Sequence, residues 1–209
     1  MYQALLWNQP LEIETTEGLF SPRGADAGTL SMVSAVELES GQKLLDLGCG
    51  AGLVGIAAAK VLGEENVWMT DVDPAAVRCA AENAKRNGVE NVHLCCGDAL
   101  DAVDASGFDW ILSNPPYHAD FSVAKKFIEK GFNRLKLGGK LVMVVKRELW
   151  YHRHLRRGAD AGDRRLLRFH RRKAQRTLRA AEAQSAQDPA QRLQKEAPRL
   201  TDKRTSFLI

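Results

Sequence analysis

Long apolar runs are absent from this 209-residue sequence, in which no stretch approaches the ~18 residues that a membrane-spanning helix needs. The first residues include Glu12, Glu14 and Glu17 and lack the basic and then apolar layout of a secretory signal. We therefore expect a cytoplasmic protein without a membrane partner.

Cysteine is also scarce, and Cys49, Cys79, Cys95 and Cys96 form no Cys-x-x-Cys pair. That spacing is typical of zinc sites, so its absence argues against a bound metal and against a disulfide framework. We expect the four thiols to be reduced and mostly buried.

Valine is missing from residues 151–209, although residues 1–150 contain fourteen, and the only isoleucine of this tail is Ile209. Because strands favour β-branched residues, we expect no ordinary strand there, and the tail is expected to be partly helical or disordered. The tail carries 16 Lys and Arg against 6 Asp and Glu, whereas residues 1–150 carry 14 against 20. The chain therefore joins an acidic body to a basic tail.

Short apolar runs alternate with amphipathic stretches through the acidic body. Strand-like runs occupy 43–48, 66–72, 91–96, 109–114 and 140–145, and helical spacing covers 52–62, 74–87 and 122–135. This alternation predicts an α/β fold with a doubly wound, mostly parallel, Rossmann-like sheet. Asp73-Pro74 predicts a helix start, and Gly138-Gly139 predicts a turn before the last strand.

Residues 1–40 are expected to form a lid over the front of the sheet. Leu11, Ile13 and Thr15 alternate with glutamates, as in a half-exposed strand, and Gly18 ends the pattern. Residues 26–38 have the apolar spacing of a helix.

Glycine gathers where the strand-like run LLDL (44–47) leads into GCGAG (48–52). Glycines let the backbone approach a ligand closely at the carboxyl end of a strand. Leu53 stands where a dinucleotide fingerprint would place glycine, which disfavours NAD and FAD. Asp46 has no evident packing role, which argues against a bare tight turn.

Acidic residues follow the next two expected strands. At Asp71 a carboxylate can accept hydrogen bonds from both ribose hydroxyls of a nucleoside-like ligand, and Val72 can contact an adenine face. Asp73 is equally suited to capping the helix that follows. Asp98 suits an exocyclic adenine amine, with a plain turn as the alternative.

The fourth expected strand ends in Ser113-Asn114-Pro115-Pro116-Tyr117. Two prolines remove two N–H donors and leave carbonyl oxygens and the Asn114 side-chain oxygen as acceptors. Such a pocket suits a planar NH₂ group, because its acceptors can direct the nitrogen lone pair toward an electrophile. Tyr117 offers a stacking face for a base or a planar amide.

In this order, the glycine-rich turn, the acidic strand ends and Asn-Pro-Pro-Tyr resemble the class I S-adenosylmethionine-dependent methyltransferases that methylate amino groups. The resemblance covers residues 18–145. Upstream, GLFS (18–21) and DAGT (26–29) resemble the subgroup that includes the catalytic domain of small-subunit rRNA guanine-N2 methyltransferases. The resemblance to these methyltransferases implies a catalytic core at 41–150 that binds S-adenosylmethionine. This core lies between the expected lid at 1–40 and the basic tail at 151–209.

The resemblance also implies a role for each motif. Asp46, Gly48 and Gly50 would hold the methionine part of the cofactor, Asp71 and Val72 the ribose and adenine face, Asp98 and Ala99 the adenine, and Asn114, Pro115, Pro116 and Tyr117 the target amine, with Asn114 also beside the cofactor. No metal is required, because the sulfonium methyl is already activated.

We therefore expect methylation of an exocyclic base amine, with guanine-N2 of ribosomal RNA as the leading substrate and RNA as the partner. The same motif serves enzymes that methylate the glutamine side chain of release factors or adenine-N6. A non-catalytic module that binds S-adenosylmethionine or RNA is the alternative from another class.

The tail departs from the family, whose sheet ordinarily ends with two further strands. We expect this closing hairpin to be missing or altered. Thirteen arginines in the tail suit an extension that binds RNA phosphates, and a solvated disordered tail is the alternative. A changed reading frame is a third hypothesis, because one choice of synonymous codons over 162–174, shifted by one base, encodes a strand-like run rich in valine and tyrosine.

Overall fold

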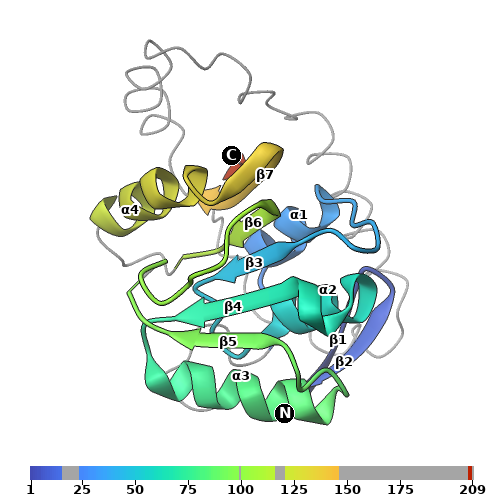
Figure 1. The fold of residues 1–209 in the computed structure, drawn as a ribbon. Helices are drawn as coiled ribbons and strands as arrows, with labels where there is room; N and C mark the ends of the chain where they lie inside the picture. Colours follow the sequence, from blue (N-terminus) through green and yellow to red (C-terminus); the bar gives the residue numbers. More distant parts are fainter. Residues whose placement is uncertain (16–23, 99, 116–120, 146–206, 209) are drawn as a thin grey trace, which may run out of the picture.

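The computed structural model describes residues 1–15, 24–98, 100–115, 121–145 and 207–208, and a six-stranded sheet forms its centre (Figure 1). The strands are β3 (Leu44–Leu47), β4 (Val67–Asp71), β5 (His93–Cys96), β6 (Phe108–Ser113), β7 (Leu135–Val145) and β8 (Phe207–Leu208). They lie in the order β5-β4-β3-β6-β7-β8, and β3 to β7 pair in parallel. The predicted α/β fold with a mostly parallel sheet is confirmed.

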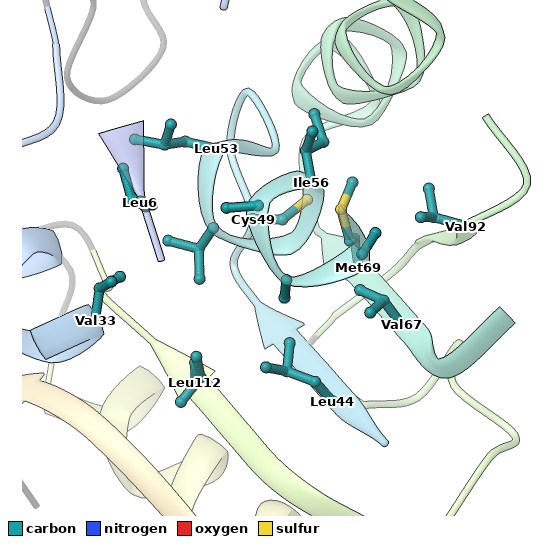
Figure 2. Packing of buried hydrophobic residues seen from close by; sticks show 14 of the residues in the cluster. Leu6, Val33, Leu44, Cys49, Leu53, Ile56, Val67, Met69, Val92 and Leu112 are labelled. Carbon is teal, nitrogen blue, oxygen red and sulfur yellow. The ribbon is translucent and has the colours of Figure 1, made fainter. Parts of the chain in front are cut away.

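Helices cover both faces of the sheet. They are α1 (Ala27–Ser34), α2 (Leu53–Leu62), α3 (Pro74–Arg86) and α4 (Phe121–Phe132), with a short 3-10 helix at Glu64–Asn66. Figure 2 shows the core on one face, where Val33 of α1 and Ile56 of α2 pack with Leu44, Met69 and Leu112 of the strands. Phe127 and Ile128 of α4 pack on the opposite face against Leu45, Leu47 and Ile111. Burial of both faces explains the continuous apolar runs of the strands.

A hairpin made of β1 (Tyr2–Leu6) and β2 (Gln9–Ile13) precedes the sheet, and β1 was not predicted. Its two turn residues, Trp7 and Asn8, have φ of 46° and 60°, the left-handed conformation of a tight two-residue hairpin turn. The hairpin packs beside α2, and Trp7 Nε1 donates to the Val36 carbonyl at 2.9 Å. The following helix, α1, is shorter than the expected 26–38.

Three further expectations need correction. The tail was expected to hold no strand, yet Phe207–Leu208 pairs antiparallel with Val144 and Val145, because main-chain hydrogen bonds do not require valine. The turn expected at Gly138-Gly139 lies within β7, where the pairing with β6 shifts register. The cysteines are free, but only Cys49 is buried, and Cys96 is exposed because it ends β5 at the sheet edge.

The order in which strands are added to the sheet changes side between β3 and β6, although the strands stay parallel. From β3 the chain builds outward through β4 to β5, then returns to place β6 on the other side of β3. Ligands of open α/β sheets bind outside the carboxyl ends of the strands at such a switch point. The glycine-rich turn follows β3 and Asn114 follows β6, so the fold brings these two motifs to that point. No helix within the described ranges is long and apolar enough to cross a membrane.

Candidate functional site

The turn after β3 is held in a conformation that favours glycine. Gly48, Gly50 and Gly52 have φ of 79°, 54° and 87°. A Cβ atom on Gly50 would meet no atom within 4 Å, whereas one on Gly52 would lie 3.1 Å from Ala80 Cβ. Gly50 therefore leaves open space at the carboxyl end of the sheet, and Gly52 allows α2 to pack closely.

Asp46 is buried below this turn, with 4% of its surface exposed. Its Oδ2 atom accepts a hydrogen bond of 2.8 Å from the Gly55 N–H in the first turn of α2. Burial raises the pKa of Asp46 to about 7, the Gly55 N–H opposes that rise, and the nearby Asp71 charge adds to it. In the structure Asp46 ties β3 to the first turn of α2, the two elements on either side of the glycine-rich turn. Its contact with a cofactor stays a prediction.

Asp71 joins the end of β4 to the glycine-rich turn. Its Oδ2 accepts from the Gly50 N–H at 2.9 Å, and its Oδ1 accepts from the Asp73 N–H at 3.0 Å. Each carboxylate oxygen can accept a further hydrogen bond, so this geometry leaves capacity for hydroxyl donors. Val72 beside it is 67% exposed, and Asp73 caps α3 by accepting from the Ala75 N–H at 2.8 Å. The capping alternative for Asp73 is confirmed.

Asp98 lies on the same edge, because the Gly97 N–H donates to the Asp71 carbonyl at 2.9 Å. Its side chain is 63% exposed and forms an ion pair with Lys126 of α4. Lys126 also lies 3.8 Å from Asp101. Sequence reasoning did not single out Lys126, which would have to share Asp98 with any ligand amine. Ala99 lies outside the described residues.

Asn114 stands directly after β6, and Ser113 ties this strand end to β3. The Ser113 hydroxyl donates to the Leu47 carbonyl at 2.7 Å, which places Asn114 beside the glycine-rich turn. Asn114 Nδ2 donates to Asp26 Oδ2 and to Thr29 Oγ1, both at 2.9 Å. Asn114 Oδ1 is buried and has no hydrogen-bond partner among the described residues.

Pro115, which is half-buried, continues from Asn114 and has no N–H to donate. Pro116 and Tyr117 lie outside the described residues, so their predicted roles stay predictions. Sequence reasoning missed the contacts of Asp26 and Thr29 with Asn114. The sequence DAGT (26–29) places an aspartate directly before a helix, which is the pattern of an N-cap. This pattern could have indicated the cap, although it does not indicate the contact with Asn114.

The described arrangement suits a nucleoside-like cofactor with a cationic centre. It offers open space at Gly50, spare acceptor capacity at Asp71, the exposed apolar side chain of Val72, and an unpartnered buried acceptor at Asn114. A buried amide oxygen without a partner is costly, so Asn114 Oδ1 is an acceptor that a donor group can satisfy.

Comparison with known proteins agrees with this arrangement. The family model "Methyltransferase small domain" matches residues 10–161. Ribosomal RNA small subunit methyltransferase C of Hahella chejuensis is 35% identical over 145 residues, which are 68% of this chain and 42% of the relative. The chain thus spans less than half the length of that relative. The uncharacterized protein YbxB of Bacillus subtilis is 33% identical over 68% of this chain and 72% of its own length.

A solved structure has the same fold. The T. thermophilus 16S rRNA N2 methyltransferase RsmC, in complex with AdoMet and guanosine, matches with a TM-score of 0.64 and 25% identity, over 72% of this chain and 43% of that one. The family model covers well over half of this sequence. The chain therefore belongs to the methyltransferase small domain family, whose members are S-adenosylmethionine-dependent methyltransferases.

Proposed function

We propose that this protein transfers a methyl group from S-adenosylmethionine to the exocyclic amine of a base, guanine-N2 of ribosomal RNA. The observation that carries the proposal is Asn114 Oδ1, a buried acceptor without a partner among the described residues, at the switch point of the sheet. Support for guanine comes from the related methyltransferase structure that contains guanosine.

Asn114 would accept one N–H of the substrate amine through Oδ1. The hydrogen bond aims the nitrogen lone pair and stabilises the positive charge that develops as the new N–C bond forms. The bound cofactor supplies an electrophilic methyl group on a sulfonium, which leaves as a neutral thioether. The methylated nitrogen would then lose one proton to solvent. No metal would be needed, because the sulfonium methyl is already activated.

Asp71 and Asp46 would act on the cofactor side. Asp71 has acceptor capacity for the ribose hydroxyls, and its bond to the Gly50 N–H keeps the glycine-rich turn in place. Asp46 holds the same turn from below through Gly55, and Val72 offers an apolar surface to the adenine. Asp98 would need to share its carboxylate between Lys126 and the adenine amine.

For a base in folded RNA, the amine would have to leave the base stack to reach Asn114. Extruding the base costs a few kcal/mol, which stacking inside the site offsets. We propose Tyr117 for this stacking, on the family resemblance. A glutamine amide or adenine-N6 also presents a planar NH₂ group, so the identity of the methylated product decides among these substrates.

Asn114→Ala tests the role of the acceptor. We expect turnover to fall by about 10² or more, on the scale of losing one preorganised polar group, while affinity for S-adenosylmethionine stays within about threefold. Turnover is measured by methyl transfer to ribosomal RNA, and affinity by calorimetry. Asn133→Ala is the matched control, because the side chain of Asn133 is exposed and, within the described ranges, donates to the Glu129 carbonyl of α4. Unchanged turnover in Asn114→Ala would refute the proposed role.

A further inference from the structure

The Asn114 amide is held from one side by two groups at the start of α1. Its Nδ2 atom donates both of its hydrogens, one to Asp26 Oδ2 and one to Thr29 Oγ1, each at 2.9 Å. Thr29 is 7% exposed, and 88 residues of sequence separate Asn114 from Asp26. The contact thus links the N-terminal segment to the end of β6.

The chemistry of these two groups determines which way the amide faces. An ionised carboxylate can only accept hydrogen bonds. The Thr29 hydroxyl uses its hydrogen on Asp26 Oδ2, at 3.0 Å, and so presents a lone pair to Asn114. A flipped amide would set its oxygen against two acceptors and lose both bonds, which leaves the observed orientation as the stable one.

Asp26 is itself held by the helix that it caps. Its Oδ1 atom accepts from the Gly28 N–H at 2.7 Å and from the Thr29 N–H at 3.1 Å. Helix α1 is anchored in the core by Met32 and Val33. One carboxylate therefore uses one oxygen to start the helix and the other to orient Asn114.

We propose that Asp26 and Thr29 are positioning residues for methyl transfer, which lock the Asn114 amide with Oδ1 toward the substrate amine. The inference rests on the proposed function, in which Asn114 Oδ1 receives that amine. A locked acceptor favours a group that donates at this point and disfavours a carbonyl oxygen, since a carbonyl would face Oδ1. Asp26 and Thr29 thereby extend the selection for NH₂ beyond the Asn-Pro-Pro-Tyr segment.

Asp26→Asn is the direct test, because the new amide can keep its oxygen on the α1 cap while its NH₂ group faces Asn114. That NH₂ cannot accept from Nδ2, so the Asn114 amide is driven to flip and present a donor to the substrate. We expect kcat to fall about 10- to 100-fold, with the Kd for S-adenosylmethionine within about threefold and the melting temperature within a few degrees.

Thr29 provides a test without a change of charge. Thr29→Val removes the acceptor with little change in volume, and we expect kcat to fall about 5- to 20-fold. Thr29→Ser is the matched control, because it retains the hydroxyl and is expected to stay within about twofold of the parent. A role limited to helix packing predicts the opposite order: Thr29→Val, which keeps the volume, would retain kcat, and Thr29→Ser, which loses a buried methyl group, would lose melting temperature.

A double-mutant cycle decides whether Asp26 acts through Asn114. In an Asn114→Ala background, Asp26→Asn should change kcat by less than about twofold. Full activity of Asp26→Asn, or the same loss in both backgrounds, would overturn the inference. If Asn114→Ala alone leaves turnover unchanged, the proposed role of Asn114 fails first, and the two failures are thereby distinguished.

Discussion

Asp46 is the residue at which burial and charge conflict most strongly. The folded protein favours its protonated form, with a pKa of about 7, whereas the unfolded chain ionises it near the ordinary value of 3.8. Its contribution to stability is therefore complete below about pH 4 and is lost progressively as pH rises to about 7. The difference between the folded and unfolded pKa values of Asp46 corresponds to a free energy on the order of 4 kcal/mol.

Asp46→Asn should remove this pH dependence. The amide oxygen can still accept from the Gly55 N–H, and no charge has to be buried near Asp71. We expect the variant to lose less stability than the parent between pH 4 and 7, and to be more stable than the parent at pH 8. Urea unfolding at pH 4, 5, 7 and 8 measures the difference.

Asp104→Asn is the control for that series, because it removes an exposed carboxylate in place of a buried one. A slope for Asp46→Asn equal to that of the parent would show that Asp46 is ionised in the folded state throughout.

At this scale, strand ends made the candidate site readable from sequence. Asp46, Asp71 and Asn114 each sit at the carboxyl end of an apolar run, and parallel strands bring such ends to one edge of the sheet. The pairing of Asp26 with Asn114 was not readable, because it depends on how α1 docks, and nothing in the local sequence of either residue specifies that. The pairing of Asp98 with Lys126 depends in the same way on the docking of α4.

At the scale of elements, Asn83 of α3 joins three parts of the structure. Its fully buried side chain donates to the carbonyls of Glu14 and Ala51, at 2.8 and 2.9 Å, and accepts from the Glu14 N–H at 2.9 Å. Ala51 belongs to the glycine-rich turn, and Glu14 follows β2. Asn83 therefore connects the hairpin segment with the cofactor side of the site.

Asn83→Ala should lower the free energy of unfolding by about 2 to 3 kcal/mol, because it removes the partner of the buried Ala51 carbonyl and both Asn83 bonds to the Glu14 backbone. It should also weaken binding of S-adenosylmethionine, through loss of order at Ala51. Urea unfolding and calorimetry measure the two effects.

The matched control is Asn91→Ala, because the side chain of Asn91 is exposed and, in the part of the chain that the structure describes, bonds to the side chain of Glu64. It should change stability by about 0.5 kcal/mol or less and leave cofactor affinity unaltered. Equal effects of the two substitutions would show that Asn83 does not connect the hairpin and the turn.

Helices and strands with a clear apolar pattern in their own sequence were predicted well. Strands that form only because they pair with another segment were not. Helix α3 begins at the predicted Asp73-Pro74 cap, and β3 to β6 overlap their apolar runs. Strand β1 was missed because Trp7 and Asn8 make a turn without the usual glycine, a conformation supported by the Trp7 bond to Val36. Strand β8 was missed because it consists of two residues paired to β7, far along the chain.

At the scale of the whole molecule, the division of charge sets an expectation for RNA binding. Residues 1–150 have more acidic than basic side chains, whereas the tail at 151–209 carries thirteen arginines. An acidic body gains little from contact with phosphates, so most counterion release should come from the tail.

Replacing Arg171, Arg172 and Arg176 by glutamine should therefore weaken RNA binding uniformly across sequences. We expect the slope of log affinity against log salt to become shallower by about 2 to 3, since each of the three lost phosphate contacts changes it by about 0.7 to 0.9. Fluorescence anisotropy with a ribosomal RNA fragment measures the slope, and Lys85→Gln on the exposed surface of α3 is the control. An unchanged slope in the triple variant would show that these three arginines make no contact with RNA phosphates.

The doubly wound, mostly parallel sheet was the feature of the whole molecule that the sequence predicted best. Alternating strands and helices specify a doubly wound sheet. Its strand order places β6 beside β3, so the turn after β3 lies beside the end of β6. The docking of the hairpin against α2 and α3 was not predicted, because it relies on the side chains of Asn83 and Asn87 acting as strand-like partners of β2.

The most direct test of the central claim is transfer of a labelled methyl group from S-adenosylmethionine to separated ribosomal RNA, transfer RNA and protein fractions. Each labelled fraction is then digested, and the modified unit is identified by chromatography. We predict label in N2-methylguanosine from ribosomal RNA, and loss of that label in Asn114→Ala. Label in glutamine or in N6-methyladenine, or no transfer by protein that binds S-adenosylmethionine, would contradict it.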